Sequence, residues 1–187
     1  MHWAYARCHD GPRHEAEREE RHGAAGQARR GGRSVSGVLG LVGWILVAFV
    51  PAWVGALATD PGWYAELARP AWAPPAGVFA PVWTVLYFLM GVAAWLVWRS
   101  HGFAGAPKAL ALFLAHLPFN AAWTWIFFGL REPGLALAEI ALLWALIAAT
   151  MIAFACHRRL AGALLAPYLA WVTYAAALNH ALWRLNP

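Results

Sequence analysis

The chain has 187 residues, of which 61% are hydrophobic and 12% are charged, and its formal net charge is +5. A soluble domain averages about 45–50% apolar and about 25% charged residues, yet here the first 33 residues alone hold seven Arg and five Asp or Glu. The rest of the chain carries too few charges to cover a water-soluble domain, whereas a membrane domain needs no charged surface.

Residues 1–33 mix both charge signs with Gly and contain almost no aliphatic side chains. Such a segment cannot bury enough apolar surface to offset its ordering entropy, so we predict a disordered charged tail. It lacks the apolar core of a secretory signal. The basic residues of the chain are spread over this tail and several short turns rather than one patch, so the charge does not indicate nucleic-acid binding.

Five apolar stretches follow, each close to the roughly 20 residues that a helix needs to cross about 30 Å of hydrocarbon. Lipid offers no hydrogen-bond partners, and a helix satisfies its backbone within one segment. The sequence therefore predicts an all-α integral membrane protein in which residues 34–187 form a bundle of five transmembrane helices. The predicted helices are residues 35–57, 80–98, 108–128, 134–156 and 163–183.

Five spans place the two chain ends on opposite sides of the membrane. The loops on the side of the N-terminus carry four basic residues in addition to the seven tail arginines, and the opposite side carries three: Arg99, Lys108, Arg158 and Arg159 against Arg69, Arg131 and Arg184. The positive-inside rule then predicts a cytoplasmic N-terminus and an external C-terminus. We expect the membrane to be that of a bacterial cell.

The segment between the first two predicted helices is rich in proline, with Pro70, Pro74 and Pro75 ahead of Pro81. Proline fixes φ and removes a backbone donor, so residues 69–79 cannot continue a helix. Pro81 is tolerated because it lies where a first helical turn would begin. We predict a stiff loop that acts as a lid over the outer mouth of the bundle, with apolar cover from two aromatic side chains, Tyr64 and Trp72.

Helical spacing gathers aromatic and polar residues on one face of three predicted helices. These stripes are Trp83 and Tyr87; His116, Asn120, Trp123 and Phe127; and Trp171, Ala175 and Asn179. Polar side chains within a span usually face the bundle interior, so the stripes would line an aromatic, sparsely polar cavity suited to a large planar apolar ligand. The same pattern also fits interhelical packing, in which the two asparagines are hydrogen-bonding contacts.

Other polar residues carry less weight. Glu139 lies near one end of a predicted span, where its carboxyl can reach the membrane interface. His180 has no clear partner for metal binding or proton transfer. Cys8 and Cys156 show neither disulfide nor metal-ligand spacing. We therefore expect no metal site and no bound cofactor, and the sequence offers no nucleophile–base pair.

Several ordered motifs resemble those of the TspO/MBR family of tryptophan-rich sensory proteins and translocator proteins. They are "ARPAWAPPAGVFAPVWTVLYFLMG" at 68–91, "LPFNAAWTWIFFGL" at 117–130, "LLWALIAAT" at 142–150 and "LLAPYLAWVTYAAALNHALWRLNP" at 164–187. The resemblance covers about residues 35–187. It implies a five-helix membrane bundle, often a homodimer, that binds porphyrins and related tetrapyrroles as a receptor, sensory or transport-type protein.

Motif matching carries the ligand-binding residues of the family onto this chain. They fall on Tyr64, Trp72, Pro74, Pro75, Trp83, Tyr87, Asn120, Trp123, Trp171 and Ala175. Light-dependent porphyrin breakdown is attributed to some members, and the tryptophans implicated would be Trp83 and Trp171 here. The alternatives to a porphyrin receptor are therefore an enzyme-like porphyrin-degrading activity, or a sterol- or lipid-binding membrane scaffold.

The chain departs from the family pattern at three places. Gly77 replaces the bulky or aromatic residue found in many family loops, which would thin the contacts of the lid. Pro118 precedes Asn120 and is expected to kink the third helix. His180 stands where animal relatives show Tyr, which breaks a sterol-recognition pattern that is weak evidence even when intact.

Overall fold

The computed structural model describes residues 37–186 of the chain. The predicted tail, residues 1–33, lies outside this range. The chain divides into two compact units between Leu39 and Gly40, and every contact described here lies within the second unit. After a first helix at Gly37–Ala56, the elements are α2 (Pro61–Glu66), η1 (Ala76–Val78), α3 (Phe79–Gly105), α4 (Pro107–Thr124), η2 (Trp125–Gly129), α5 (Pro133–His157) and α6 (Arg159–Leu185).

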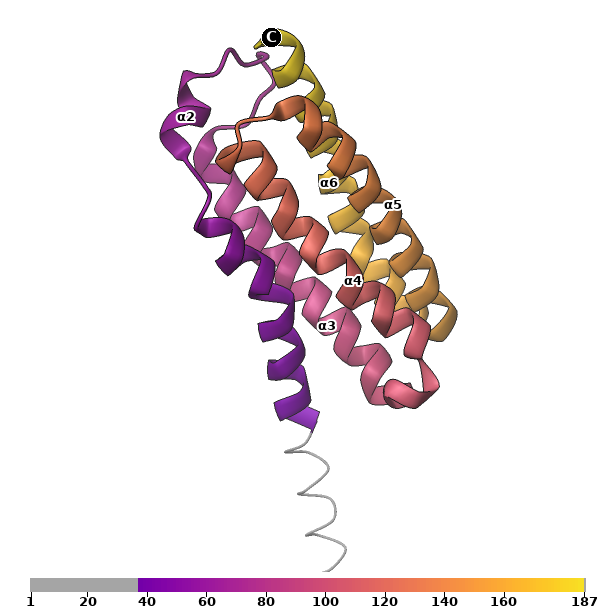
Figure 1. Ribbon diagram of the computed structural model, residues 1–187. Coiled ribbons are helices and arrows are strands. Elements are labelled where there is room, and N and C mark those ends of the chain that lie inside the picture. Colours follow the sequence, from indigo (N-terminus) through magenta and orange to yellow (C-terminus); the bar gives the residue numbers. More distant parts are fainter. Residues whose placement is uncertain (1–36, 187) are drawn as a thin grey trace, which may run out of the picture. The chain divides into compact units, whose positions relative to one another are not determined.

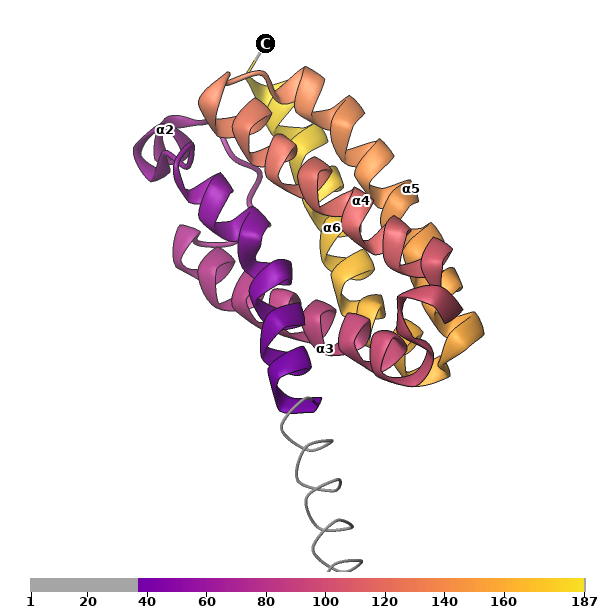
Figure 2. The ribbon, with the colours of Figure 1, turned by 60° about the horizontal axis from the view of Figure 1, so that its bottom comes forward.

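Five helices in the described part of the chain are long and apolar enough to cross a membrane, which confirms the predicted all-α class with five spans. Figure 1 shows α3, α4, α5 and α6 running side by side along one direction, with α5 and α6 as neighbours. Figure 2, from another side, shows the same arrangement of α4, α5 and α6. No strand occurs among residues 37–186.

Two of the helices extend well beyond the apolar runs that predicted them. α3 ends at Gly105 rather than residue 98, although its backbone is broken at Gly102 (φ 65°), and α6 begins at Arg159 rather than residue 163. A hydropathy boundary stops at the first charged side chain, but the backbone can stay helical in the polar headgroup region. The connections are correspondingly short, since only Ala106 separates α3 from α4 and only Arg158 separates α5 from α6.

Two glycines allow helices to approach closely. A Cβ added at Gly91 of α3 would lie 2.6 Å from the Cα of Ile45 in the first helix. A Cβ at Gly162 of α6 would lie 2.6 Å from the Cβ of Ala155 in α5. Small residues are a common basis of helix association in membranes because they let backbones meet and gain van der Waals contact.

The third span does not end at its proline. Pro118 lies inside α4, which continues to Thr124, and the helix then widens into the π-helical turn η2. The Leu130 N–H donates to the Trp125 carbonyl at 2.9 Å, which is the i→i+5 bond of a π turn. The helix therefore becomes irregular at Trp125, about two turns beyond Pro118, beside the residues that close one end of the bundle.

Candidate ligand-binding site

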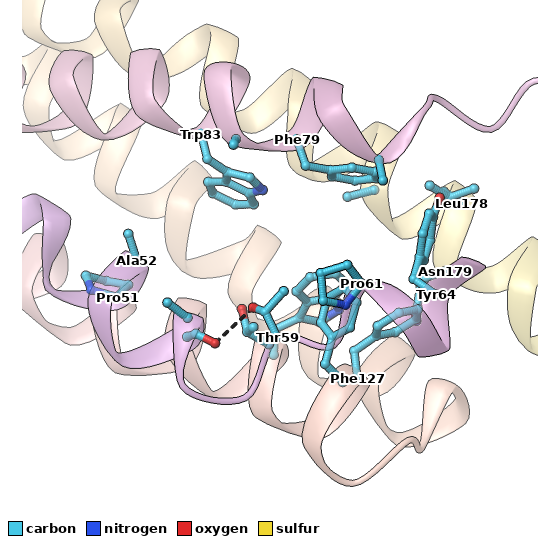
Figure 3. Close-up of a pocket in the computed structure, with 18 of the residues that line it drawn as sticks. Pro51, Ala52, Thr59, Pro61, Tyr64, Phe79, Trp83, Phe127, Leu178 and Asn179 are labelled. Carbon is cyan, nitrogen blue, oxygen red and sulfur yellow. Dashed lines mark hydrogen bonds between the residues drawn. The ribbon is translucent and has the colours of Figure 1, made fainter. Parts of the chain in front are cut away.

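A cavity of about 560 Å³ lies within the bundle, in the half that holds α2. Figure 3 shows Trp83 and Phe79 of α3 on one side of it and Pro51, Ala52 and Thr59 on the other. The first helix, α2, η1, α3, α4, η2 and α6 all contribute to its wall, whereas no residue of α5 does. The lining residues are Pro51, Ala52, Gly55, Ala56, Thr59, Pro61, Tyr64, Ala76, Phe79, Ala80, Trp83, Tyr87, Trp123, Thr124, Phe127, Phe128, Trp171, Ala175, Leu178, Asn179 and Leu182.

Aromatic rings dominate this wall and hold one another in place. Trp83 stacks on Tyr87 with ring centroids 5.2 Å apart and planes 24° apart. Trp123 stacks in the same way on Phe127, one turn further along the chain, at 5.2 Å and 18°. The i, i+4 spacing that placed each pair on one helix face also brings the rings into contact. The cavity thus has flat, preformed surfaces.

Tyr87, which lines the cavity, belongs to a buried chain of hydrogen bonds that joins three helices. The Tyr87 hydroxyl donates to Oδ1 of Asn120 at 2.6 Å, and Nδ2 of Asn120 donates to the Tyr168 hydroxyl at 2.8 Å. Tyr168 in turn packs edge-to-face with Trp83, with ring centroids 6.0 Å apart. Asn120 does not line the cavity itself. Asn120 holds the two tyrosines that contact Trp83. Its position therefore fits the interhelical-packing interpretation of the stripe rather than direct contact with a ligand.

Replacing Asn120 with Leu removes both bonds and leaves the hydroxyls of Tyr87 and Tyr168 without their partner. We expect the free energy of unfolding to fall by about 1–2 kcal/mol, since interhelical hydrogen bonds in membranes contribute modestly but orphaned buried hydroxyls are costly. Unfolding of the purified protein in a denaturing detergent measures this. Adding Tyr87→Phe and Tyr168→Phe to Asn120→Leu should recover part of the loss. A triple variant less stable than the single one would contradict this account.

The wall contains polar groups that have no hydrogen-bond partner among the described residues. They include the indole N–H groups of Trp123 and Trp171 and the side-chain carbonyl of Asn179. The amide nitrogen of Asn179 is engaged, because it donates to the Pro133 carbonyl at 3.0 Å. The hydroxyl of Tyr64, which also lines the cavity, has no hydrogen-bond partner within the described range either. Buried polar groups are nearly always paired, so these four groups give the wall three unused donors and an unused carbonyl acceptor.

Tyr64 closes the cavity from the α2 side and is almost fully buried. Burial raises the pKa of the Tyr64 hydroxyl, and the guanidinium of Arg69, which lies 5.4 Å from the ring centroid, opposes that shift. The group therefore stays protonated at neutral pH. The wall as a whole holds no charged side chain, which favours neutral or largely apolar ligands.

The structure brings together six of the ten residues that motif matching assigned to the site. Those on the wall are Tyr64, Trp83, Tyr87, Trp123, Trp171 and Ala175. Asn120 lies behind the wall. Pro74 and Pro75 line a separate, polar hollow beside Arg69. Trp72 is 50% exposed, and its ring packs against Tyr174 with centroids 5.7 Å apart rather than over the cavity.

Sequence reasoning missed most of the wall that the first helix provides. Pro51, Ala52, Gly55 and Ala56 line the cavity. Gly55 lets the first helix approach α4 closely, since a Cβ added there would lie 3.2 Å from the side chain of Thr124. The four residues share small size or proline character, but Gly40, Gly43 and Ala48 of the same helix do too, so the sequence held no clear signal for this part of the wall. Phe79 was also missed, although Phe127 and Asn179 already belonged to predicted stripes.

Comparison with known proteins matches residues 43–184 to the TspO/MBR family. The chain is 45% identical over 136 residues to a tryptophan-rich sensory protein of Cereibacter sphaeroides, covering 73% of this chain and 84% of that protein. It is 43% identical over 126 residues to the human translocator protein (66% and 75%). It is 36% identical over 152 residues to the tryptophan-rich protein TspO of Archaeoglobus fulgidus (80% and 98%). Every cavity-lining residue falls inside the matched region.

Proposed function

The chain belongs to the TspO/MBR family and is a multi-pass integral membrane protein, and from this we propose that it binds porphyrins and similar large planar apolar ligands as a receptor, sensory or transport-type protein. The observation that carries the proposal is the cavity of about 560 Å³ walled by stacked aromatic rings. Ligand sites are typically clefts of about 300–1,000 Å³ with few polar groups. The unpaired N–H groups of Trp123 and Trp171 supply such groups for orientation.

Titration of the detergent-solubilised protein with protoporphyrin IX in the dark tests this proposal. We expect saturable quenching of tryptophan fluorescence at micromolar ligand, because several indoles lie on the cavity wall and would contact a bound ring system. Empty micelles and a soluble tryptophan standard serve as controls for partitioning and light absorption. Quenching that rises without saturation would mean that porphyrin only partitions into the micelle, and would contradict the proposal.

Light-driven breakdown of bound porphyrin is a second candidate function, favoured by the position of Trp83 and Trp171 on the wall of one cavity. Replacing each with Phe keeps an aromatic surface but removes the indole. We expect protoporphyrin IX still to bind to Trp83→Phe and Trp171→Phe, and its loss of absorbance under steady illumination to slow at least about tenfold. Photobleaching at the wild-type rate in both variants would exclude an indole-dependent reaction.

The charges at the two ends of the helices support the proposed orientation. The end that holds the α3–α4 and α5–α6 connections carries four basic residues, Arg99, Lys108, Arg158 and Arg159, and no acidic residue within the described range. The opposite end carries Arg69, Arg131 and Arg184 beside Asp60, Glu66 and Glu132. By the positive-inside rule, we propose that the first end faces the cytoplasm of a bacterial cell and the cavity end faces outward.

A cysteine at Gly77 tests this orientation in a Cys8→Ser/Cys156→Ser background. The position is exposed, and an added Cβ meets no atom within 4 Å, so the substitution should not disturb the fold. We expect Gly77→Cys to react with a membrane-impermeant thiol reagent in intact cells, and Lys108→Cys at the other end to react only after lysis. The reverse pattern would invert the topology.

We also propose that the protein forms a homodimer in the membrane. Ala111 and Ala115 lie one turn apart on the exposed face of α4. Small residues at this spacing let two helices approach closely, and van der Waals packing then drives association in lipid.

A further inference from the structure

One chain segment covers the cavity on the side of α2, and we call residues 60–76 the cap. Pro61, Tyr64 and Ala76 of the cap lie in the cavity wall. Residues 67–75 of the cap do not line the cavity but link α2 to η1. Prolines at 70, 74 and 75 restrict the backbone conformations of this link, so we expect the cap to move as one piece. Such a movement requires that the contacts between the cap and the bundle break.

The polar attachment at the start of the cap is weak, and beside it the rings of Trp63 and Tyr64 pack against Phe79, Phe127 and Phe128. Asp60 caps α2 by accepting a bond from the Trp63 N–H at 3.1 Å, and its other oxygen pairs with Arg131 at 3.2 Å. The side chains of this ion pair are 43% and 58% exposed. Exposed ion pairs contribute little to stability. We therefore expect this ion pair to act as a hinge of the cap and not to hold the cap closed.

A second attachment lies on the far side of α2, where the Asn186 side chain forms two hydrogen bonds with the backbone of Ala68. The Ala68 N–H donates to Oδ1 of Asn186 at 3.0 Å, and Nδ2 of Asn186 donates back to the Ala68 carbonyl at 3.1 Å. The same Nδ2 also donates to the Leu182 carbonyl at 2.8 Å, which fixes the side chain on the end of α6. One amide thereby ties the cap to α6 through two hydrogen bonds.

A third attachment connects the cap with the cavity wall itself. The Tyr174 hydroxyl of α6 donates to the Trp72 carbonyl at 3.1 Å, and the ring of Trp72 packs against that of Tyr174. The ring of Tyr174 also packs against that of Trp171, with centroids 5.5 Å apart, and Trp171 lines the cavity. This attachment explains why the ring of Trp72 lies outside the cavity.

We propose that Asn186 is a positioning residue that latches the cap shut, with Tyr174 as the second part of the latch, so that these two side chains set the rate of exchange between the cavity and its surroundings. The identity of the exchanging ligand rests on the proposed function, whereas the latch does not. All three latch bonds lie at exposed positions, where each contributes modestly. The cap can therefore open reversibly, as lids that gate binding sites do.

The latch predicts a kinetic signature that a merely structural role does not. If ligand passes only through the open state, weakening the latch raises the open fraction with and without ligand. Association and dissociation then accelerate together, and Kd changes little. A residue that only supports the fold would instead lower affinity without speeding association.

Thiol modification tests the latch without any ligand. Ala175→Cys, in a Cys8→Ser/Cys156→Ser background, places one reporter thiol in the cavity wall, and N-ethylmaleimide is the probe. Asn186→Leu removes both bonds to Ala68, and we expect modification to speed up about tenfold. Tyr174→Phe removes one bond but keeps the ring, so an increase of about threefold is expected. Unchanged rates in both variants would overturn the proposal.

Thr173→Val is the matched control. Thr173 neighbours Tyr174 on α6 and accepts a bond from the Trp144 indole at 2.8 Å, so the variant also loses an interhelical hydrogen bond but leaves the cap untouched. Its modification rate should equal that of the parent. An acceleration as large as that of Asn186→Leu would show that general loosening of α6, and not the latch, controls access.

Stopped-flow quenching with protoporphyrin IX in the dark forms the second arm. In Asn186→Leu, we expect the association rate and the dissociation rate of protoporphyrin IX both to rise. Each increase should agree, to within about twofold, with the increase in the thiol modification rate. Weaker binding with unchanged association would overturn the latch. If protoporphyrin IX does not bind to the parent protein, the proposed function fails, and the thiol series still decides whether the latch exists.

Discussion

The double variant Trp83→Ala/Trp171→Ala is expected to lose saturable protoporphyrin IX binding, with Kd raised at least about a hundredfold. The two indoles lie on α3 and α6 and both line the cavity. A buried aromatic anchor typically contributes well over the free energy of a tenfold change in affinity, about 1.4 kcal/mol. Removing both indoles takes one large flat contact surface from each of two helices. Equilibrium titration in the dark measures the change.

The control for this variant is Trp144→Ala. Trp144 is 41% exposed and lies on α5, which does not contribute to the cavity, so Kd should stay within about twofold of the parent. Trp83 also packs against Tyr87 and Tyr168, and thermal unfolding must therefore show that the double variant is folded. A folded double variant that binds protoporphyrin IX as tightly as the parent would refute the assignment of the cavity as the ligand site.

Gly91→Val is expected to destabilise the protein by about 1–3 kcal/mol and to weaken ligand binding as well. A Cβ at this position would lie 2.6 Å from the Cα and 3.0 Å from the backbone nitrogen of Ile45. Backbone atoms cannot rotate away as a side chain can, so the first helix must shift, and overpacking of this kind typically costs about that much. The first helix also carries Pro51, Ala52, Gly55 and Ala56 of the cavity wall, which would move with it.

Unfolding in denaturing detergent and the protoporphyrin IX titration measure the two effects of Gly91→Val. Gly43→Val provides the comparison, because Gly43 lies on the first helix and an added Cβ there meets no atom within 4 Å. It should change stability by only a few tenths of a kcal/mol. A Gly91→Val protein as stable as Gly43→Val would show that the two helices are not held at the observed distance.

The sequence predicted the features of the fold that depend on local periodicity. Apolar runs of bilayer length predicted five spans because the thickness of the hydrocarbon dictates helix length. The spacing of Trp83 and Tyr87, and of Asn120 and Trp123, predicted which face of α3 and α4 turns inward, and the structure places all four in or directly behind the cavity wall.

Features that depend on which helices meet were beyond such reasoning. Gly91 is one of 17 glycines, and only the position of Ile45 makes it a point of close contact. Asn186 and Ala68 are 118 residues apart, so no local pattern links them. Trp72 was expected to cover the cavity because it lies in the proline-rich loop with other aromatic residues. In the structure its ring packs against Tyr174 instead. Tertiary partners decide such positions, and one sequence does not reveal them.

The separation of α5 from the cavity divides the molecule into two regions under different evolutionary constraints. The first helix, α3, α4 and α6 must preserve the shape of the wall, whereas α5 must only remain apolar toward lipid and fit against α4 and α6. Exposed positions of α5 such as Leu142 and Ile152 can therefore drift among apolar residues without touching the cavity wall. Proteins with this fold that share one ligand are expected to diverge furthest on the outer face of α5, and that face is where adaptation to a different lipid composition would have the most freedom.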